Sequence, residues 1–159
     1  MAGKPEAQEV SRDVATNRAA RHKYVTVETM EAGIELRGTE VKALRDGNAR
    51  LQDSYAAIEE GQIFLRGAYI PPYAPASREN HEPERARKLL LHRYEIERLI
   101  GRMQRKGLTL IPTRIYFKGN KAKVELALAR GKDHQDRRRE IRDRDVARDV
   151  ERELKDRNR

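Results

Sequence analysis

Four histidines are the side chains in this sequence best suited to acid–base chemistry, and their spacing does not form a catalytic motif. They are His22, His81, His92 and His134. No two have the helical spacing of a zinc site, and the sequence contains no glycine-rich phosphate loop and no Gly-x-Ser-x-Gly turn. Acid–base cleavage of RNA needs little more than two histidines and a carboxylate, so a small metal-independent ribonuclease built on His22, His81 and a glutamate stays an open alternative. We expect surface or RNA-contacting histidines instead, with no catalytic residue, no cofactor and no metal ion.

Positively charged side chains carry a stronger signal than the histidines. The chain of 159 residues has 35 Lys or Arg against 26 Asp or Glu, which gives a net charge of +9. Basic residues gather over 17–23, over 85–88 and around the last expected hairpin over 114–132. Neutralisation of phosphates by such groups dominates affinity for nucleic acid. Aromatic residues that could stack unpaired bases on a barrel surface lie among or near them, namely Tyr24, Tyr55, Tyr73, Tyr116 and Phe117. The sequence therefore favours nucleic-acid binding.

The composition excludes several other classes of protein. No cysteine is present, which excludes a disulfide framework, a thiolate zinc site and a cysteine nucleophile. No apolar run reaches the ~18 residues of a membrane-spanning helix, and the first ten residues lack the apolar stretch of a signal peptide. We expect a cytoplasmic protein that has no membrane partner.

Short strands are the main elements expected to position the basic and aromatic side chains. Alternating or β-branched runs predict strands over 24–30, 34–36, 54–58, 62–65, 108–111, 114–117 and 123–129. Ala32-Gly33 is interpreted as a turn, and Gly119-Asn120 as the two-residue turn of a hairpin. Mostly antiparallel strands of this length predict a mainly β fold, a small barrel of the oligonucleotide-binding (OB) kind, although a sandwich fits the same periodicity.

Helices are expected at two places in the same region. Ile96, Leu99, Ile100 and Met103 follow the spacing of an amphipathic helix that ends at Gly107. A shorter helix is expected over 40–46.

Three zones are expected along the chain. Residues 1–16 are polar and predict a flexible arm, residues 17–131 hold the barrel, and residues 132–159 form a tail. The tail has 11 basic and 9 acidic residues among its 28, so the rest of the chain holds +7 of the net charge of +9. Its few apolar groups predict disorder in the free protein. Both a solubilising tail and a segment that folds on an RNA or ribosomal surface fit this composition.

Eight motifs occur in order over residues 17–127. They are Asn17-Arg18-Ala19-Ala20-Arg21-His22, Glu31-Ala32-Gly33-Ile34, Gly38-Thr39-Glu40-Val41-Lys42-Ala43-Leu44-Arg45, Asp53-Ser54-Tyr55-Ala56, Asn80-His81-Glu82-Pro83, Arg87-Lys88-Leu89-Leu90-Leu91-His92, Gly107-Leu108-Thr109-Leu110-Ile111-Pro112 and Lys123-Val124-Glu125-Leu126-Ala127. Together they resemble the small protein B family, the bacterial proteins that bind tmRNA (SsrA RNA), and the resemblance covers about residues 17–152.

The resemblance implies an OB-like barrel with flanking helices and a role without catalysis in trans-translation, the rescue of stalled ribosomes. It implies that a monomeric protein grips the tRNA-like domain of tmRNA and replaces the missing anticodon arm. Elongation factor Tu would then deliver the charged complex to the ribosome. By this resemblance, the residues expected to bind tmRNA are Glu31, Leu90, His92 and Lys123, with Asn17, Arg18, Arg21 and His22 nearby.

The resemblance also assigns a role to the tail. The family's tail is disordered when free and becomes helical in the message channel, near the small-subunit RNA of the decoding centre. Its Asp-Lys-Arg signature falls here on Asp136, Arg137 and Arg138, so an arginine replaces the lysine. Lys132 and Gln135 complete the expected set, and Gln135 stands where the family often has Tyr or His. A structural protein that binds ribosomal RNA permanently is the alternative function.

Overall fold

Antiparallel strands form most of the structure, a computed structural model that describes residues 11–76 and 80–158. The elements in chain order are β1 (Ser11–Thr16), α1 (Arg18–Lys23), β2 (Tyr24–Ile34), α2 (Gly38–Arg45), β3 (Tyr55–Glu59), β4 (Gln62–Arg66), β5 (Arg87–Leu90), α3 (Arg93–Lys106), β6 (Thr109–Lys118), β7 (Lys121–Gly131) and α4 (His134–Arg157).

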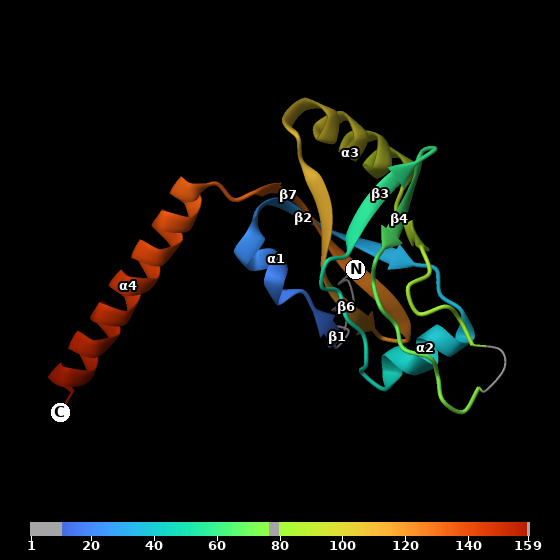
Figure 1. Ribbon diagram of the computed structural model, residues 1–159, viewed down its shortest axis with the longest axis horizontal. Helices are drawn as coiled ribbons and strands as arrows, with labels where there is room; N and C mark the ends of the chain where they lie inside the picture. Colours follow the sequence, from blue (N-terminus) through green and yellow to red (C-terminus); the bar gives the residue numbers. More distant parts are fainter. Residues whose placement is uncertain (1–10, 77–79, 159) are drawn as a thin grey trace, which may run out of the picture.

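The sheet closes on itself through its two longest C-terminal strands (Figure 1). Its strand order is β1-β6-β3-β4-β5-β2-β7, and β6 pairs with β7 as well. Six strands therefore make a closed barrel, and β1 adds to it by pairing with β6. The predicted mainly β, antiparallel OB-like barrel is confirmed. The Gly119-Asn120 turn joins β6 to β7, as its sequence predicts.

Alternating side chains of the long strands fill the barrel. Val124, Leu126 and Leu128 on β7 are fully buried, as their period-two pattern predicts. Leu44 of α2 and Leu99 of α3 are buried against the same core. Both helices therefore cover the barrel through one apolar face each, with α3 over one end of it (Figure 1).

A buried carboxylate ties α2 to β5. Glu40 and Arg87 are both fully buried, and Arg87 donates to Glu40 and to the carbonyl oxygens of Ala68 (2.9 Å) and Pro83 (3.0 Å). Arg85 donates to the same carboxylate. Burial raises the pKa of Glu40, but the hydrogen bonds from Arg85, from the backbone and from Arg87 outweigh burial and hold it below its ordinary value. Glu40 therefore stays ionised at the centre of this contact.

The structure corrects the expected boundaries at two strands. β2 runs through Ala32-Gly33 without a turn, because residues 29–33 pair continuously with β7. The two strands expected over 108–111 and 114–117 are one strand, β6, whose register shifts between Pro112 and Arg114. A proline has no N–H to give to a ladder, which explains the irregularity at this point.

The structure also differs from the sequence-based prediction at the N-terminal end. Of the flexible arm expected over 1–16, residues 1–10 lie outside the described residues, while residues 11–16 form β1, so the prediction was wrong for that part. Its partner, β6, is about a hundred residues away in the sequence, which no local pattern reveals. The short helix α1 was also missed, and Asn17 begins it by accepting a hydrogen bond from the N–H of Ala20.

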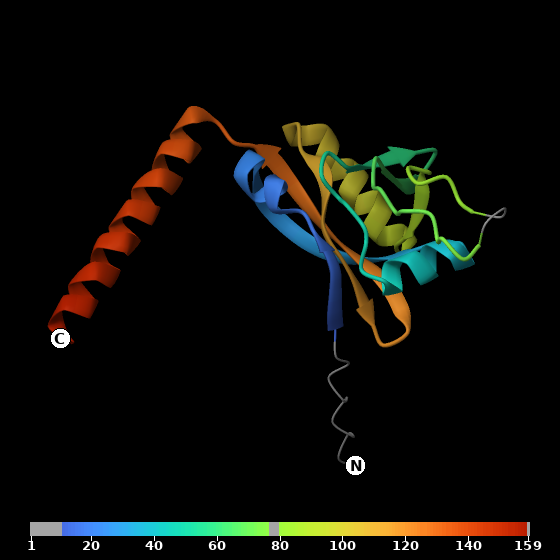
Figure 2. The same ribbon diagram turned by 60° about the horizontal axis from the view of Figure 1, so that its bottom comes forward.

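Most of the tail forms the helix α4 (His134–Arg157). Asp133 begins α4 by accepting from the N–H of Asp136 (2.8 Å), and the pairs Glu140–Arg144 and Glu151–Lys155 connect successive turns. These local contacts favour a helix without any core. Beyond its first turns α4 stands away from the barrel (Figures 1 and 2), so the expected lack of packing holds. The large apolar side chains on it are all exposed, namely Ile141, Val146, Val150 and Leu154.

Loss of the buried charge should destabilise the protein strongly. Glu40→Gln leaves Arg87 buried without its anion, so the free energy of unfolding should fall by about 3–5 kcal/mol. The matched control is Glu59→Gln, which breaks an exposed pair with Arg66 and should cost at most about 1 kcal/mol. Urea unfolding at neutral pH measures both.

The contribution of Glu40 to stability should also depend on pH. Because folding lowers the pKa of Glu40, this contribution is complete above the unfolded value of 4.5 and is lost as pH falls through the lower, folded value. Equal losses in the two variants would contradict the structural role of Glu40.

Removal of α4 should leave the barrel folded. Deletion of residues 133–159 removes helix surface that buries almost no apolar area, so the free energy of unfolding should change by less than about 1 kcal/mol. Thermal and urea unfolding of the truncated chain measure the change. A loss above about 2 kcal/mol would mean that the tail packs on the barrel.

Candidate nucleic-acid interface

A row of register partners across four strands forms the centre of the candidate site. Gly33 on β2 lies directly between Leu90 on β5 and Lys123 on β7, and Lys123 in turn faces Tyr116 on β6. Direct partners in an antiparallel sheet point to the same face. Since Gly33 has no side chain, the row is hollow at its middle, between Leu90 and Lys123.

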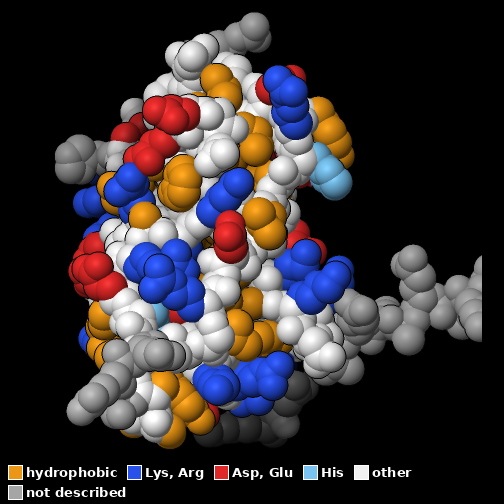
Figure 3. Space-filling model, turned by 90° about the vertical axis from the view of Figure 1, so that its right-hand side faces the viewer, with side chains coloured by type: hydrophobic (Ala, Val, Ile, Leu, Met, Phe, Trp, Pro, Cys, Tyr) orange, Lys and Arg blue, Asp and Glu red, His pale blue; other side chains and the backbone are white. Residues whose placement is uncertain are grey.

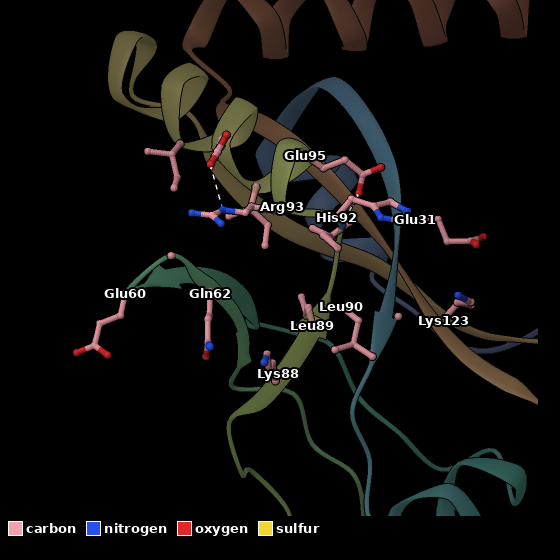
Figure 4. Close-up of a pocket in the computed structure, with 16 residues that line it drawn as sticks. Glu31, Glu60, Gln62, Lys88, Leu89, Leu90, His92, Arg93, Glu95 and Lys123 are labelled. Carbon is pink, nitrogen blue, oxygen red and sulfur yellow. Dashed lines mark hydrogen bonds and ion pairs between the residues drawn. The ribbon is translucent and has the colours of Figure 1, made fainter.

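This hollow is part of an open groove of about 920 Å³ (Figure 4). Strands β2, β5 and β7 form its floor, while the first turns of α3 and the β3–β4 turn form its walls. Arg98 and Arg102 hold α3 against β2, because both donate to Glu28 of β2. The groove is lined by Glu31, Gly33, Glu60, Gly61, Gln62, Lys88, Leu89, Leu90, Leu91, His92, Arg93, Glu95, Ile96, Glu97, Ile100 and Lys123.

Apolar and aromatic surface is available at this groove. Leu90 is 50% exposed, which is unusual for a leucine in the middle of a sheet. His92 stacks on Tyr94, with ring centroids 5.5 Å apart and planes 11° from parallel, and Tyr94 is 68% exposed. A flat pair of rings, one of which lines the groove, is suited to stacking on an unpaired base. Tyr94 was missed by the sequence analysis, and its position next to His92 was the available signal.

Glu31 is held in place by a buried tyrosine. The hydroxyl of Tyr116 donates to one carboxylate oxygen, and Lys118 Nζ lies 3.8 Å from the other. Burial, together with this hydrogen bond, raises the pKa of Tyr116. Tyr116 therefore stays protonated, and it orients a carboxylate that still has lone pairs free to accept from N–H groups such as those of a guanine edge.

The charge on the groove is mixed. Its cations are Lys88, Arg93 and Lys123, and its carboxylates are Glu31, Glu60, Glu95 and Glu97. Figure 3 shows one side of the molecule on which Lys and Arg side chains are interspersed with acidic and hydrophobic ones. The groove therefore does not attract phosphate groups uniformly. A ligand must instead match the positions of the charges in the groove.

The expected tmRNA-binding residues thus fall into two groups. Glu31, Leu90, His92 and Lys123 meet in the groove, although they come from β2, β5, the start of α3 and β7. The stretch at residues 17–22 does not line it. Arg18, Arg21 and His22 lie exposed on α1.

Asn17 has a structural role. It is 6% exposed, its side-chain amide donates to Pro112 O (3.0 Å), and its backbone N–H donates to Thr113 O (2.7 Å). These two carbonyl groups lie beside the irregularity in β6, and Asn17 supplies their hydrogen-bond donors. The same residue begins α1. Both polar atoms of the Asn17 side chain are therefore engaged within the protein.

The expected decoding-centre residues lie at the start of α4. Gln135, Arg137 and Arg138 are exposed. Lys132 and Asp136 are instead engaged by other groups of the protein.

Other sequence-based candidates have structural positions. Tyr116 and Phe117 are at most 9% exposed, so neither offers a face to a base. His81 is 3% exposed, and its two ring nitrogens contact Thr39 Oγ1 and Ile70 O, both at 2.9 Å. His22 is exposed on α1. A ribonuclease site that uses His22 and His81 is therefore wrong, because His81 has neither access to substrate nor a free nitrogen.

No cluster of metal-ligating side chains occurs in residues 11–76 and 80–158. Within the same part of the chain, no helix has the length and apolar character needed to cross a membrane.

Comparisons with known proteins agree with one another. The family described as SmpB protein matches residues 14–156. The SsrA-binding protein of Pelotomaculum thermopropionicum is 53% identical over 146 residues, covering 92% of this chain and 95% of that protein. The SsrA-binding protein of Mycolicibacterium vanbaalenii is 52% identical over 156 residues, covering 97% and 94%. A chain from the solved structure "tmRNA-SmpB: a journey to the center of the bacterial ribosome" is 48% identical, with a TM-score of 0.63, over 80% of this chain and 93% of that one.

The hollow at Gly33 should show in the stability of an alanine variant. A Cβ atom at Gly33 would lie 3.1 Å from the Cβ of Leu90, whereas one at Gly101 of α3 would meet nothing within 4 Å. Gly101→Ala should therefore raise the free energy of unfolding by about 0.5–1 kcal/mol, as expected when Gly is replaced inside a helix. Gly33→Ala should give no such gain, because the close contact with Leu90 offsets the stability gained from the lower backbone entropy of the unfolded chain. Urea unfolding compares the two, and an equal gain at both positions would contradict the close approach.

Proposed function

Since this chain belongs to the SmpB family, we propose that it binds tmRNA and serves trans-translation, the rescue of stalled ribosomes. The observation that carries the proposal is the groove at Gly33, where the four residues implied by the family resemblance lie together. The two relatives are SsrA-binding proteins, and the solved structure concerns tmRNA, SmpB and the ribosome. These comparisons support tmRNA and the ribosome as partners of this chain.

The groove is our proposed site for the tRNA-like domain of tmRNA. Lys123 on one side of Gly33 supplies a cation for phosphate, and Leu90 on the other side supplies apolar surface. The stacked pair of His92 and Tyr94 offers a ring face to an unpaired base. Glu31, oriented by Tyr116, accepts from base N–H groups. This mixture suits a folded loop with exposed bases better than a regular duplex, whose bases are hidden in stacks.

We propose that two other surfaces complete the function. Arg18, Arg21 and His22 on α1 contact phosphates of tmRNA outside the groove. Gln135, Arg137 and Arg138 on α4 face the small-subunit RNA near the decoding centre, because their side chains are exposed on a helix that projects from the barrel (Figure 2). The barrel within residues 17–131 and the tail over 132–159 would thus act on different RNAs.

The role proposed here is binding without catalysis. It places the protein in the cytoplasm, where ribosomes work, as a monomer that replaces the anticodon arm missing from tmRNA. Elongation factor Tu would meet it through the charged tmRNA. The buried position of His81 supports a role other than cleavage of RNA.

Substitutions in the groove should weaken tmRNA binding more than substitutions beside it. Lys123→Ala should reduce affinity for the tRNA-like domain about three- to tenfold, roughly 1 kcal/mol, and should make the log–log salt slope about one unit shallower. The matched control is Lys121→Ala, two residues earlier on β7 and outside the groove, which should change affinity less than about twofold. Glu31→Gln should also weaken binding, but with an unchanged salt slope, because a carboxylate releases no phosphate counterion.

Gel-shift titrations at several salt concentrations measure these effects. Equal losses from Lys121→Ala and Lys123→Ala would contradict the groove as the binding site and would indicate only a general effect of charge.

The tail should act after tmRNA is bound. Arg137→Ala combined with Arg138→Ala should leave tmRNA affinity within about threefold, under ~1 kcal/mol, and should abolish peptide tagging on stalled ribosomes. The control, Arg148→Ala with Arg152→Ala, removes the same charge from a later part of α4 and should keep most of the tagging. Gel shifts and in vitro tagging in parallel measure the two steps. Loss of tmRNA binding in the first variant, or normal tagging, would disprove this division.

A further inference from the structure

The rows of side chains at the groove continue across the sheet to the edge strand β1. Asp13 on β1 is the direct register partner of Tyr116 on β6. In the neighbouring row, Glu31 on β2 faces Glu125 on β7, and Glu125 in turn faces Arg114 on β6. Direct partners, and residues two apart on one strand, point to the same face of a sheet. These five side chains therefore lie together on the face that carries the groove.

Arg114 connects three of the other side chains on this face. Its Nε donates to Glu125 (2.7 Å), and its Nη1 donates to Asp13 (2.8 Å). The guanidinium carbon also lies over the Tyr116 ring, 4.3 Å from the ring centroid. Two carboxylates on different edges of a planar group fix its orientation, and a cation over the face of a ring is itself attracted to it. Arg114 is therefore held in place as a cover on Tyr116.

Tyr116 passes this restraint to Glu31. The tyrosine is only 3% exposed, and its hydroxyl group donates to the Glu31 carboxylate. Glu125 is the like charge directly opposite Glu31, and its pairing with Arg114 compensates the repulsion between the two carboxylates. The contacts thus form a chain that begins at Asp13 and ends at a carboxylate in the groove.

We propose that Asp13 and Arg114 are positioning residues for Glu31, although neither of them lines the groove. Strand β1 therefore contributes to recognition of tmRNA without touching it. This inference rests on the proposed function of the groove and adds the part of the fold that sets the direction of Glu31. An exposed pair such as Asp13–Arg114 contributes little to stability, so its loss should appear in the affinity for RNA more than in unfolding.

The sign of one substitution separates positioning from a general effect of charge. Asp13→Asn removes a negative charge, so general attraction to phosphate predicts tighter binding of tmRNA. Positioning of Glu31 predicts the opposite, a loss of affinity of about two- to threefold. The control is Glu59→Gln, which removes the same charge from a similarly exposed pair with Arg66 and should not weaken binding.

Gel-shift titrations with the tRNA-like domain measure both variants. Asp13→Glu keeps the carboxylate and should retain the affinity of the parent. Tighter binding by Asp13→Asn, or an equal loss in Glu59→Gln, would overturn the proposal.

A double-mutant cycle tests the route through Glu31. Tyr116→Phe should reduce affinity about three- to fivefold in the parent and should have no further effect in a Glu31→Ala background. Arg114→Lys keeps the positive charge but loses the planar group that contacts two carboxylates, so it should show the same dependence on Glu31 with an unchanged salt slope. Urea unfolding of each variant identifies a purely structural loss, which would be the same in both backgrounds. Additive losses of affinity would contradict the chain of contacts.

Nuclear magnetic resonance of the free protein tests the orientation of Glu31 without RNA. Three-bond couplings of the Glu31 side chain should report one rotamer in the parent and an average over several rotamers in Tyr116→Phe and Asp13→Asn. Glu59→Gln should leave these couplings unchanged. Averaged couplings in the parent, or unchanged couplings in Tyr116→Phe and Asp13→Asn, would disprove the positioning role. Failure of the parent to bind tmRNA would instead contradict the proposed function of the groove, which the couplings do not depend on.

Discussion

The register of β2 against its two neighbours is the constraint on which the candidate site depends. It places Gly33 between Leu90 and Lys123, so a residue without a side chain separates an apolar side chain from a cationic one. A shift by one residue would turn all three to the opposite face of the sheet, because side chains alternate along a strand. Glu31, two residues earlier on β2, lies on the same face for the same reason. The groove is therefore a product of strand pairing more than of any loop.

Contacts elsewhere in the barrel maintain this register. The pairing of β6 with β7 closes the sheet, which leaves β7 supported on both sides. Glu40 and Arg87 connect α2 to β5 from within, next to the strand that carries Leu90. On the core-facing side of β2, Glu28 attaches α3, and on the opposite face Tyr116 orients Glu31. Each of these charged or polar contacts joins segments that are distant in sequence, so the groove is held by the whole barrel.

The two candidate surfaces differ in how their charges are arranged. In the groove, cations and carboxylates lie close together, and selectivity must come from their placement. On α4 nearly every side chain is exposed, and beyond its first turns the helix stands away from the barrel (Figures 1 and 2). α1 lies between the two surfaces. Asn17 fastens it to β6, its own basic residues face solvent, and its last carbonyl groups receive Lys132 at the start of the tail.

Local patterns in the sequence were enough for several parts of this structure. The alternation of Val124, Leu126 and Leu128, the helical spacing that ends at Gly107 and the Gly119-Asn120 turn each depend on neighbouring residues only. The family motifs also indicated Glu31, Leu90, His92 and Lys123, although no pattern placed them side by side.

Only the tertiary structure decided how the remaining residues are used. Ala32-Gly33 has the residue types of a turn, but Gly33 lies within β2, because β5 and β7 pair with it from both sides. β1 forms because it pairs with β6. Asn17 is buried where it bonds to the irregular part of β6. Tyr116 and His81 have side chains suited to an exposed site and are instead buried with their polar atoms bonded. In each case the deciding partner comes from a distant part of the chain, and burial depends on that partner rather than on the residue itself.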